Sequence, residues 1–185
     1  MEPSVTTSDI AQLQKLVAEF SSHGDDYVFT HLTGADRLIS NQPVQPIRIS
    51  GMAWILVIKG SFQINLNLDP VAVEAGSVVI LMPDTIISER EVTPDIDAYL
   101  LMLSPEFMRT INIDPNVMMT LPTATIHEYK PVLPLSAKEQ ELMKSYFELI
   151  HHNTLSNPDG MYVKSIARNL MSAMICLLYT SDAAD

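Results

Sequence analysis

Apolar and polar side chains alternate without a break between Ser61 and Leu68. The apolar positions are Phe62, Ile64, Leu66 and Leu68, and the polar positions between them are Ser61, Gln63, Asn65 and Asn67. Because successive side chains of a strand point to opposite faces of a sheet, this pattern predicts a strand with one buried face and one solvated face.

Other short apolar segments predict further strands, and residues such as Gly60 and Pro70 predict the turns between them. The additional predicted strands cover residues 27–32, 46–50, 53–59, 77–81, 86–92 and 98–103. Many short strands separated by tight turns are typical of an antiparallel sandwich or small barrel. The pattern therefore favours a mostly β fold with some α, built on a cupin-like (jelly-roll) β-barrel.

Apolar residues at helical spacing predict helices on both sides of this β-rich region. At the N-terminus they recur from Ile10 to Phe20, with Ser8 predicted as the cap and Gly24 close to the helix end. A second, short helix is predicted over residues 105–110.

Two longer helices are predicted near the C-terminus. Ser136 and Glu139 have the spacing of a capping box, and Asn157 to Gly160 has the composition of a turn. The first of these helices carries an apolar face of Leu142, Met143, Tyr146, Phe147, Leu149 and Ile150, and the second places Tyr162, Ile166, Leu170, Ala173 and Met174 on one side. Two amphipathic helices joined by a short turn predict an antiparallel helical hairpin.

Composition limits the functions that this segment can have. The 185 residues, of which 47% are hydrophobic, suffice for one domain with its own core. The 11 basic and 22 acidic residues give a formal net charge of −11, which disfavours nucleic-acid binding by the segment itself. The N-terminus lacks a secretory signal and no apolar run is long enough to span a membrane, so we expect a cytoplasmic protein with no membrane partner.

The segments around the predicted strand at residues 61–68 resemble a known family. Lys59-Gly60-Ser61 lies between two strands, and Val-Glu-Ala-Gly-Ser at 73–77 and Val-Ile-Leu-Met-Pro at 79–83 follow it. In order and spacing, these motifs resemble the cupin-type sensing domain of AraC-type (arabinose-regulator-like) transcription factors. The resemblance covers roughly residues 27–175.

The resemblance implies a domain that binds a small-molecule effector and forms a homodimer through its helices. Together with the N-terminal helix expected at 1–24, it gives a cupin-like effector-binding barrel at 25–104 and a helical dimerisation region at 105–175. Members of the family normally continue into a domain with two helix-turn-helix motifs. We expect any DNA contact to be made through such a domain, which this sequence does not include.

The last ten residues, 176–185, resemble the translation of a transposon adapter used in sequencing libraries. On this interpretation the natural sequence is interrupted near Ile175, and the tail should be left out of reasoning about the fold. The alternative is an ordinary helix end followed by a polar tail. The single cysteine, Cys176, lies in this tail, so nothing in the sequence indicates a disulfide framework.

Metal-dependent cupin enzymes place several histidines and a glutamate on neighbouring strands, where they converge on one ion. This sequence has no histidine between His31 and His127. We therefore expect no metal site, no catalytic residues and no cofactor, which disfavours the rival reading as a cupin enzyme such as an isomerase. His151 and His152 are interpreted as cations near a helix C-terminus, and Asp95 and Asp97 as carboxylates of a solvated turn.

Candidate effector contacts follow from the predicted barrel interior. Phe62 and Ile64 are expected to face inward, with Trp54 and Tyr99 as aromatic walls and Arg48 as a cation for an acidic effector. Each has a plainer reading: a packed core without ligand for the first four, and an ordinary surface arginine for the fifth. A third function therefore stays open, a dimerisation module with a sealed core.

The predicted dimer contact lies on the first long helix. Its candidate residues are Leu142, Tyr146, Leu149 and Ile150. An apolar face this broad can serve both the barrel and a partner subunit.

Overall fold

Two β-sheets form the body of the fold in the computed structural model, which describes residues 6–17, 19–34, 46–111 and 131–182. The five-stranded sheet has the order β1 (Thr6–Ser8), β4 (Ile47–Ile49), β9 (Ile86–Val92), β6 (Ser61–Leu66) and β7 (Asp69–Glu74). The six-stranded sheet has the order β11 (Val132–Pro134), β8 (Ser77–Leu81), β5 (Met52–Lys59), β10 (Asp97–Leu103), β3 (Tyr27–Thr33) and β2 (Ser21–His23).

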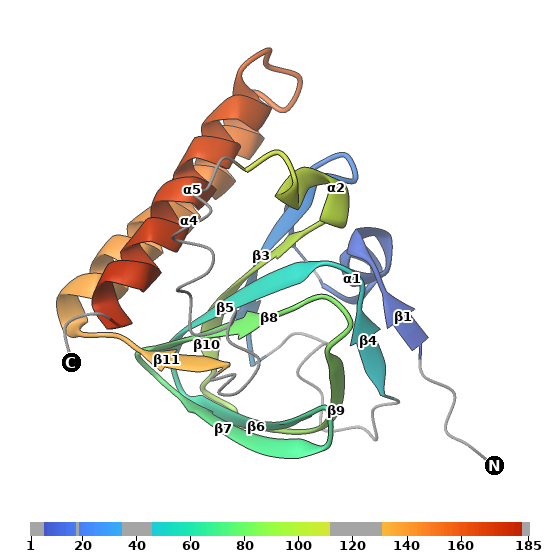
Figure 1. The fold of residues 1–185 in the computed structure, drawn as a ribbon, viewed down its shortest axis with the longest axis vertical. Coiled ribbons are helices and arrows are strands. Elements are labelled where there is room, and N and C mark those ends of the chain that lie inside the picture. The colour runs from blue at the N-terminus through green and yellow to red at the C-terminus, as the bar shows by residue number, and fades with distance from the viewer. Residues whose placement is uncertain (1–5, 18, 35–45, 112–130, 183–185) are drawn as a thin grey trace.

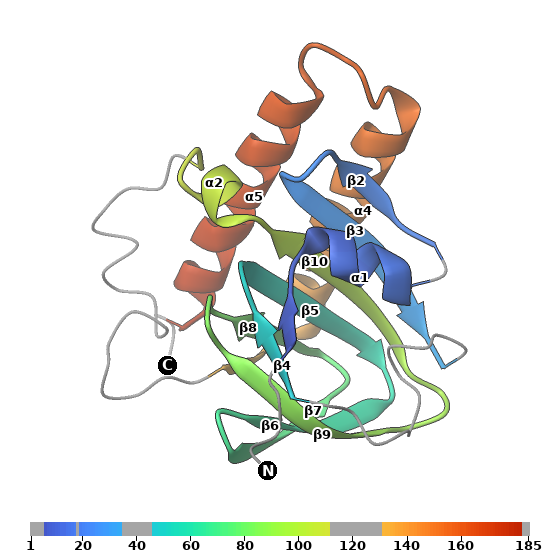
Figure 2. The same cartoon turned by 90° about the vertical axis from the view of Figure 1, so that its right-hand side faces the viewer.

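A helical hairpin covers one side of this barrel (Figures 1 and 2). Helices α4 (Ala137–Ser156) and α5 (Val163–Asp182) run side by side, and α4 contacts β2, β5 and β10 of the six-stranded sheet. Apart from the parallel pair β1 and β4, the paired strands of the described chain are antiparallel. The cupin-like barrel followed by an antiparallel hairpin confirms the predicted fold class.

The hairpin begins and turns as the sequence predicts. The Ser136 hydroxyl accepts a hydrogen bond from the Glu139 amide, and the Glu139 carboxylate accepts one from the Ser136 amide at 2.7 Å. This reciprocal capping box satisfies amide groups that have no partner within the first turn of a helix. At the other end of α4, the side chain of Asn153 donates to the carbonyl of Val163 at 3.0 Å and holds the two helices together.

The six-stranded sheet is buried on both faces. Its inner face packs against the five-stranded sheet in an inner core that contains Val57, Phe62, Ile64, Leu100 and Met102. Its outer face packs against the hairpin and α2 (Pro105–Met108) in a second cluster, called the seam core here. That cluster contains Tyr27, Phe29, Trp54, Leu101, Phe107, Met143, Phe147, Ile150, Ala167, Met171 and Met174.

The N-terminal segment differs from the predicted helix. Helix α1 (Ile10–Leu16) is capped by Asp9, not Ser8, and the Asp9 carboxylate accepts from the Gln12 amide at 2.8 Å. Ser8 belongs to β1, and residues 21–23 form β2 instead of a helix end. Pairing with β4 and β3 satisfies the backbone of these segments, so tertiary contacts override a weak local helix preference.

The turn after β6 also differs from the prediction. Leu68 is 84% exposed, not buried, and it follows Asn67 in a turn where both residues have positive φ, 50° and 81°. Positive φ at two consecutive residues gives the backbone twist that a two-residue hairpin turn needs. Leu66 and Asp69, on either side of the turn, are paired. Pro70, expected in a turn, lies inside β7, where it is tolerated because β7 is an edge strand.

Helix α5 meets the core with a face that only partly matches the predicted one. Val163, Ala167, Met171 and Met174 are buried, whereas Ile166 is 44% exposed. Tyr162 lies before the helix start and is 68% exposed. Met174 is buried as predicted and Leu170 packs against the seam core, so the predicted and observed faces overlap in the second half of the helix and differ at its start. Residues 176–182, expected to be adapter-derived, continue α5, and Leu178 is buried in the seam core.

Strand β11 belongs to the six-stranded sheet, although it lies in the region after residue 104 that was predicted to be helical.

His127 lies outside the described residues. Among the helices that the structure describes, none combines the length and the apolar character needed to cross a membrane.

Candidate functional site

The predicted effector contacts do not share one cavity wall. Phe62 and Ile64 are buried in the inner core, as predicted. Trp54 is buried in the seam core, and Tyr99 packs against the same cluster, so both aromatic side chains lie on the outer face of the six-stranded sheet. The expectation that they line the barrel interior is wrong, because side chains alternate along β5 and β10 and these two occupy the outward positions.

Arg48 lies away from the inner core. Its neighbours on β4, Ile47 and Ile49, pack on that core, so Arg48 points to the other face. Its guanidinium lies 3.8 Å from the carboxylate of Asp84, and both side chains are substantially exposed. A surface arginine, the plainer reading, describes this position.

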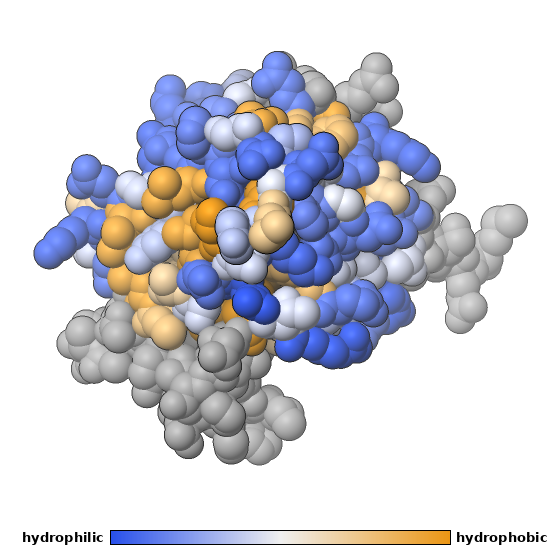
Figure 3. All heavy atoms as spheres, turned by 90° about the horizontal axis from the view of Figure 1, so that it is seen from above, coloured by the Kyte–Doolittle hydropathy of each residue, from blue (hydrophilic) through white to orange (hydrophobic). Residues whose placement is uncertain are grey.

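The four predicted dimer residues divide between two environments. Ile150 is fully buried in the seam core, and Tyr146 is half-buried against it. Leu142 is 41% exposed and Leu149 is 51% exposed. Figure 3 looks onto the end of the molecule that carries the α4–α5 connection and shows apolar surface gathered on one side of this view. Among the side chains of the hairpin and its turn that the structure describes, the exposed large apolar ones are Leu142, Leu149, Leu155, Met161, Tyr162 and Ile166.

Polar contacts fasten the hairpin to the six-stranded sheet near β3. The hydroxyl of Thr154 donates to the Ile150 carbonyl at 2.7 Å, which leaves its oxygen to accept from the Tyr27 hydroxyl at 2.8 Å. Burial is the main cause that raises the pKa of Tyr27, so its hydroxyl stays protonated. Lys164 of α5 binds the carboxylate of Asp26 at 2.8 Å.

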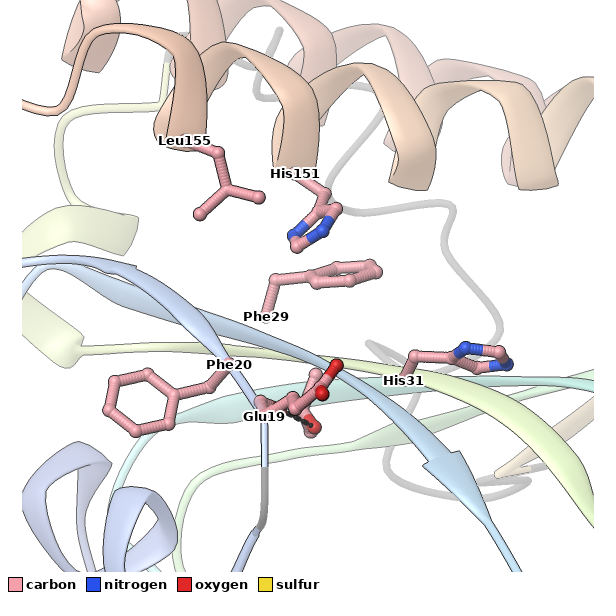
Figure 4. Close-up of a pocket in the computed structure, with 7 residues that line it drawn as sticks. Glu19, Phe20, Phe29, His31, His151 and Leu155 are labelled. Atoms are coloured by element: carbon pink, nitrogen blue, oxygen red, sulfur yellow. Dashed lines mark hydrogen bonds between the residues drawn. The ribbon is translucent and has the colours of Figure 1, made fainter.

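A groove of about 460 Å³ lies next to these contacts, between α4 and the β2–β3 edge of the sheet. Its lining residues are Glu19, Phe20, Phe29, Thr30, His31, His151 and Leu155. Figure 4 shows Leu155 and His151 projecting from the helix toward Phe29, with Phe20, Glu19 and His31 on the strand side. Phe29 and Thr30 are buried, and Phe20 and Leu155 are exposed on opposite sides.

His151 connects the helix to the floor of the groove. Its ring centroid lies 4.5 Å from that of Phe29, and its Nδ1 is 2.8 Å from the Ser21 hydroxyl. Burial, followed by the charges of His152 and His31, lowers the pKa of His151 from 6.5, and Glu19 opposes this. The imidazole is therefore neutral at pH 7. The interpretation of His151 as a cation near a helix C-terminus is wrong, because the ring is half-buried against Phe29 of the sheet and burial favours its neutral form.

His31 and Tyr99 extend this contact along the sheet. The Nε2 atom of His31 is 2.7 Å from the Asp97 carboxylate, so Asp97 is a paired residue of β10 and not a free turn carboxylate. Tyr99 lies between His31 and α4, with ring centroids 4.7 Å apart from His31, and donates to Glu148 at 3.1 Å. Burial and the neighbouring Glu148 raise the pKa of Tyr99 to about 12.

The sequence contains a signal for this groove, although none of the predicted effector contacts lines it. Tyr27, Phe29 and His31 alternate along β3 and so share one face, which the structure turns toward α4. On α4, His151 and Leu155 follow the buried Phe147 at intervals of four residues, so they extend its side of the helix. The two patterns could not be matched without knowing that these elements pack together.

Among the described residues, no group of three or more histidine, cysteine, aspartate or glutamate side chains could hold a metal ion.

No protein-family model matches the sequence, and no curated protein matches it. Among solved structures, the AraC-like transcriptional activator CuxR has a TM-score of 0.44 and 13% identity, covering 86% of this chain and 49% of that chain. ToxT from Vibrio cholerae with a bound unsaturated fatty acid has a TM-score of 0.46 and 12% identity, covering 86% and 56%. A cupin 2 barrel protein from Leptotrichia buccalis has a TM-score of 0.36 and 17% identity, covering 46% and 39%. The chain spans about half the length of the two regulators.

Proposed function

We propose that this chain is the effector-sensing and dimerisation part of an AraC-type transcription regulator. The observation that carries the proposal is the six-stranded sheet with two packed faces, one lining the barrel and one supporting the hairpin. Protein interiors are close-packed, so a ligand that displaces side chains on one face of these strands also disturbs the packing on the other face. The choice of family rests on the resemblance of the motifs at residues 59–61, 73–77 and 79–83.

On this proposal the chain binds a small molecule without converting it, works in the cytoplasm as a homodimer, and reaches DNA through a further domain outside this sequence. The chain's own net charge of −11 supports leaving the DNA contact to another domain.

A thermal-denaturation screen tests the sensing role. The purified chain is mixed with a panel of sugars, carboxylic acids and amines, and we expect one class to raise the midpoint, because a ligand that binds the folded state stabilises it. Each stabilising compound is then incubated with the protein and recovered. Conversion of the compound into a product would contradict a binding role and favour a cupin enzyme, and a panel without any stabilising compound would favour a dimerisation module with a sealed core.

The substitution Leu149→Asp tests the dimer. Because Leu149 is 51% exposed, the change leaves the monomer fold intact, but it places an unpaired charge in any interface built on this face. We expect the dimer dissociation constant to rise by at least about ten-fold, measured by light scattering over a range of protein concentrations. Gln63→Glu, an added charge on the exposed face of β6, is the matched control. A parent chain that stays monomeric at high concentration would refute the dimer.

A further inference from the structure

The groove beside α4 has the apolar walls of a ligand site. Phe20, 42% exposed, and Leu155, 57% exposed, are two of the chain's exposed large apolar side chains, and both line it. Phe29 lies deeper, where it is 1% exposed and in contact with the His151 ring (Figure 4). A ligand with an apolar body would remove both exposed side chains from water, which favours binding in proportion to the area covered.

The charged groups of the groove favour a cation. Glu19 supplies the carboxylate, and its backbone carbonyl is held by the Thr30 hydroxyl at 2.6 Å. His151 is neutral at pH 7, because its pKa is lowered from 6.5. The Nε2 atom of His31 lies 2.7 Å from the Asp97 carboxylate. Any positive charge on His31 is therefore balanced by Asp97 and does not attract an anion into the groove. The net charge of −11 adds a long-range field that attracts small cations.

We propose that this groove binds a small amphipathic amine, in which a protonated primary or secondary amino group pairs with Glu19 and an aromatic or aliphatic body packs between Phe20 and Leu155. The site is outside the barrel interior. That the bound amine acts as an effector rests on the proposed function, whereas binding itself does not.

Three compounds of matched size test the proposal by isothermal titration calorimetry at pH 7. They are phenethylamine, the neutral 2-phenylethanol and the anionic 3-phenylpropionate. Charge-assisted hydrogen bonds are stronger than neutral ones, so we expect the amine to bind at least about ten-fold more tightly than either of the others. Equal or tighter binding of the acid, or no saturable binding of the amine at millimolar concentration, would overturn the proposal.

Two variants place the binding in this groove. Glu19→Gln keeps the backbone carbonyl that Thr30 needs, so the fold is retained, and we expect amine affinity to fall by about ten-fold with little change for 2-phenylethanol. Leu155→Ala should weaken both compounds. Glu74→Gln, an exposed glutamate on edge strand β7, is the control that should change neither. Amine binding that survives Glu19→Gln unchanged would assign it to another site.

Nuclear magnetic resonance gives a readout that does not depend on a variant folding. Titration of phenethylamine should shift the side-chain signals of His151 and Phe29, whose rings are in contact. Shifts confined to residues of the inner core would contradict the groove, yet they would support the proposed sensing function. Failure of this inference is therefore distinguishable from failure of that function.

Discussion

The two sheets of this protein bury their side chains differently. Along β6 of the five-stranded sheet, Phe62, Ile64 and Leu66 are buried and Gln63 between them is exposed, so one face is wet. Along β8 of the six-stranded sheet all five residues are buried. The difference arises because the hairpin covers the outer face of the six-stranded sheet (Figure 2). A strand's hydrophobic pattern thus reports how many of its faces are covered.

The two cores also differ in composition. The inner core is almost entirely aliphatic, with Phe62 as its aromatic member. The seam core gathers most of the buried aromatic rings: Tyr27, Phe29, Trp54, Phe107 and Phe147. Polar links also gather there, such as Tyr27 with Thr154 and His151 with Ser21. Aromatic rings with polar atoms can pack and still form directed bonds, which suits a contact between barrel and hairpin that must hold one register.

Phe147→Ala is the most damaging test of the seam core. Phe147 is fully buried and its ring packs near those of Phe29 and Tyr99. Deleting this ring should lower the free energy of unfolding by about 3–5 kcal/mol, measured by urea denaturation. Leu149→Ala, two residues away on the exposed side, should cost less than about 1 kcal/mol. Similar losses in both variants would contradict the placement of the hairpin on the sheet.

Tyr27→Phe removes a buried polar link of the same core while keeping the ring. Thr154 retains its donation to the Ile150 carbonyl, so the loss is one hydrogen bond, and the expected cost is about 1–1.5 kcal/mol. Tyr99→Phe removes a bond to Glu148 at the exposed edge and should change stability by less than about 0.5 kcal/mol. A larger loss of stability for Tyr99→Phe than for Tyr27→Phe would mean that the exposed bond to Glu148, and not the buried bond to Thr154, holds the hairpin on the sheet.

Leu68→Gly distinguishes the turn of the five-stranded sheet from the prediction that Leu68 is buried. Leu68 has φ 81°, a conformation that glycine adopts without strain, and its side chain is 84% exposed. The substitution should stabilise the protein by about 1 kcal/mol, seen as a higher midpoint in thermal denaturation. Leu66→Ala, at a buried position two residues earlier, should instead destabilise by about 2–5 kcal/mol. A large loss for Leu68→Gly would mean that the strand continues as the alternation suggested.

His151 provides the smallest test, through pH. Burial first, then His152 and His31, lower its pKa in the folded state below 6.5, against the effect of Glu19. Between the folded and unfolded pKa values the unfolded chain binds more protons, so stability is present above pH 6.5 and falls as pH decreases toward the folded value. His151→Gln should flatten this part of a profile of unfolding free energy against pH from 5 to 7.5. An unchanged slope would mean that other groups set it.

Much of the fold could be predicted because several of its signals are local. The capping box at Ser136 and the turn before Gly160 depend on neighbours in sequence, and both are confirmed. The alternation in β6 correctly predicted Phe62 and Ile64 as buried. The groove could not be predicted in the same way, because it joins segments about 130 positions apart, as the hydrogen bond between Ser21 and the lining residue His151 illustrates.

The sequence by itself determined where most of the strands lie along the chain, the hairpin and its start, and the acidic charge, because local spacing and composition suffice for these. The tertiary structure alone decided which face each apolar side chain meets. It placed Trp54 and Tyr99 outside the barrel, because a strand buried on both faces carries no alternation to tell inside from outside. It also brought His151 over Phe29, since the position of α4 on the sheet is set by packing between distant residues.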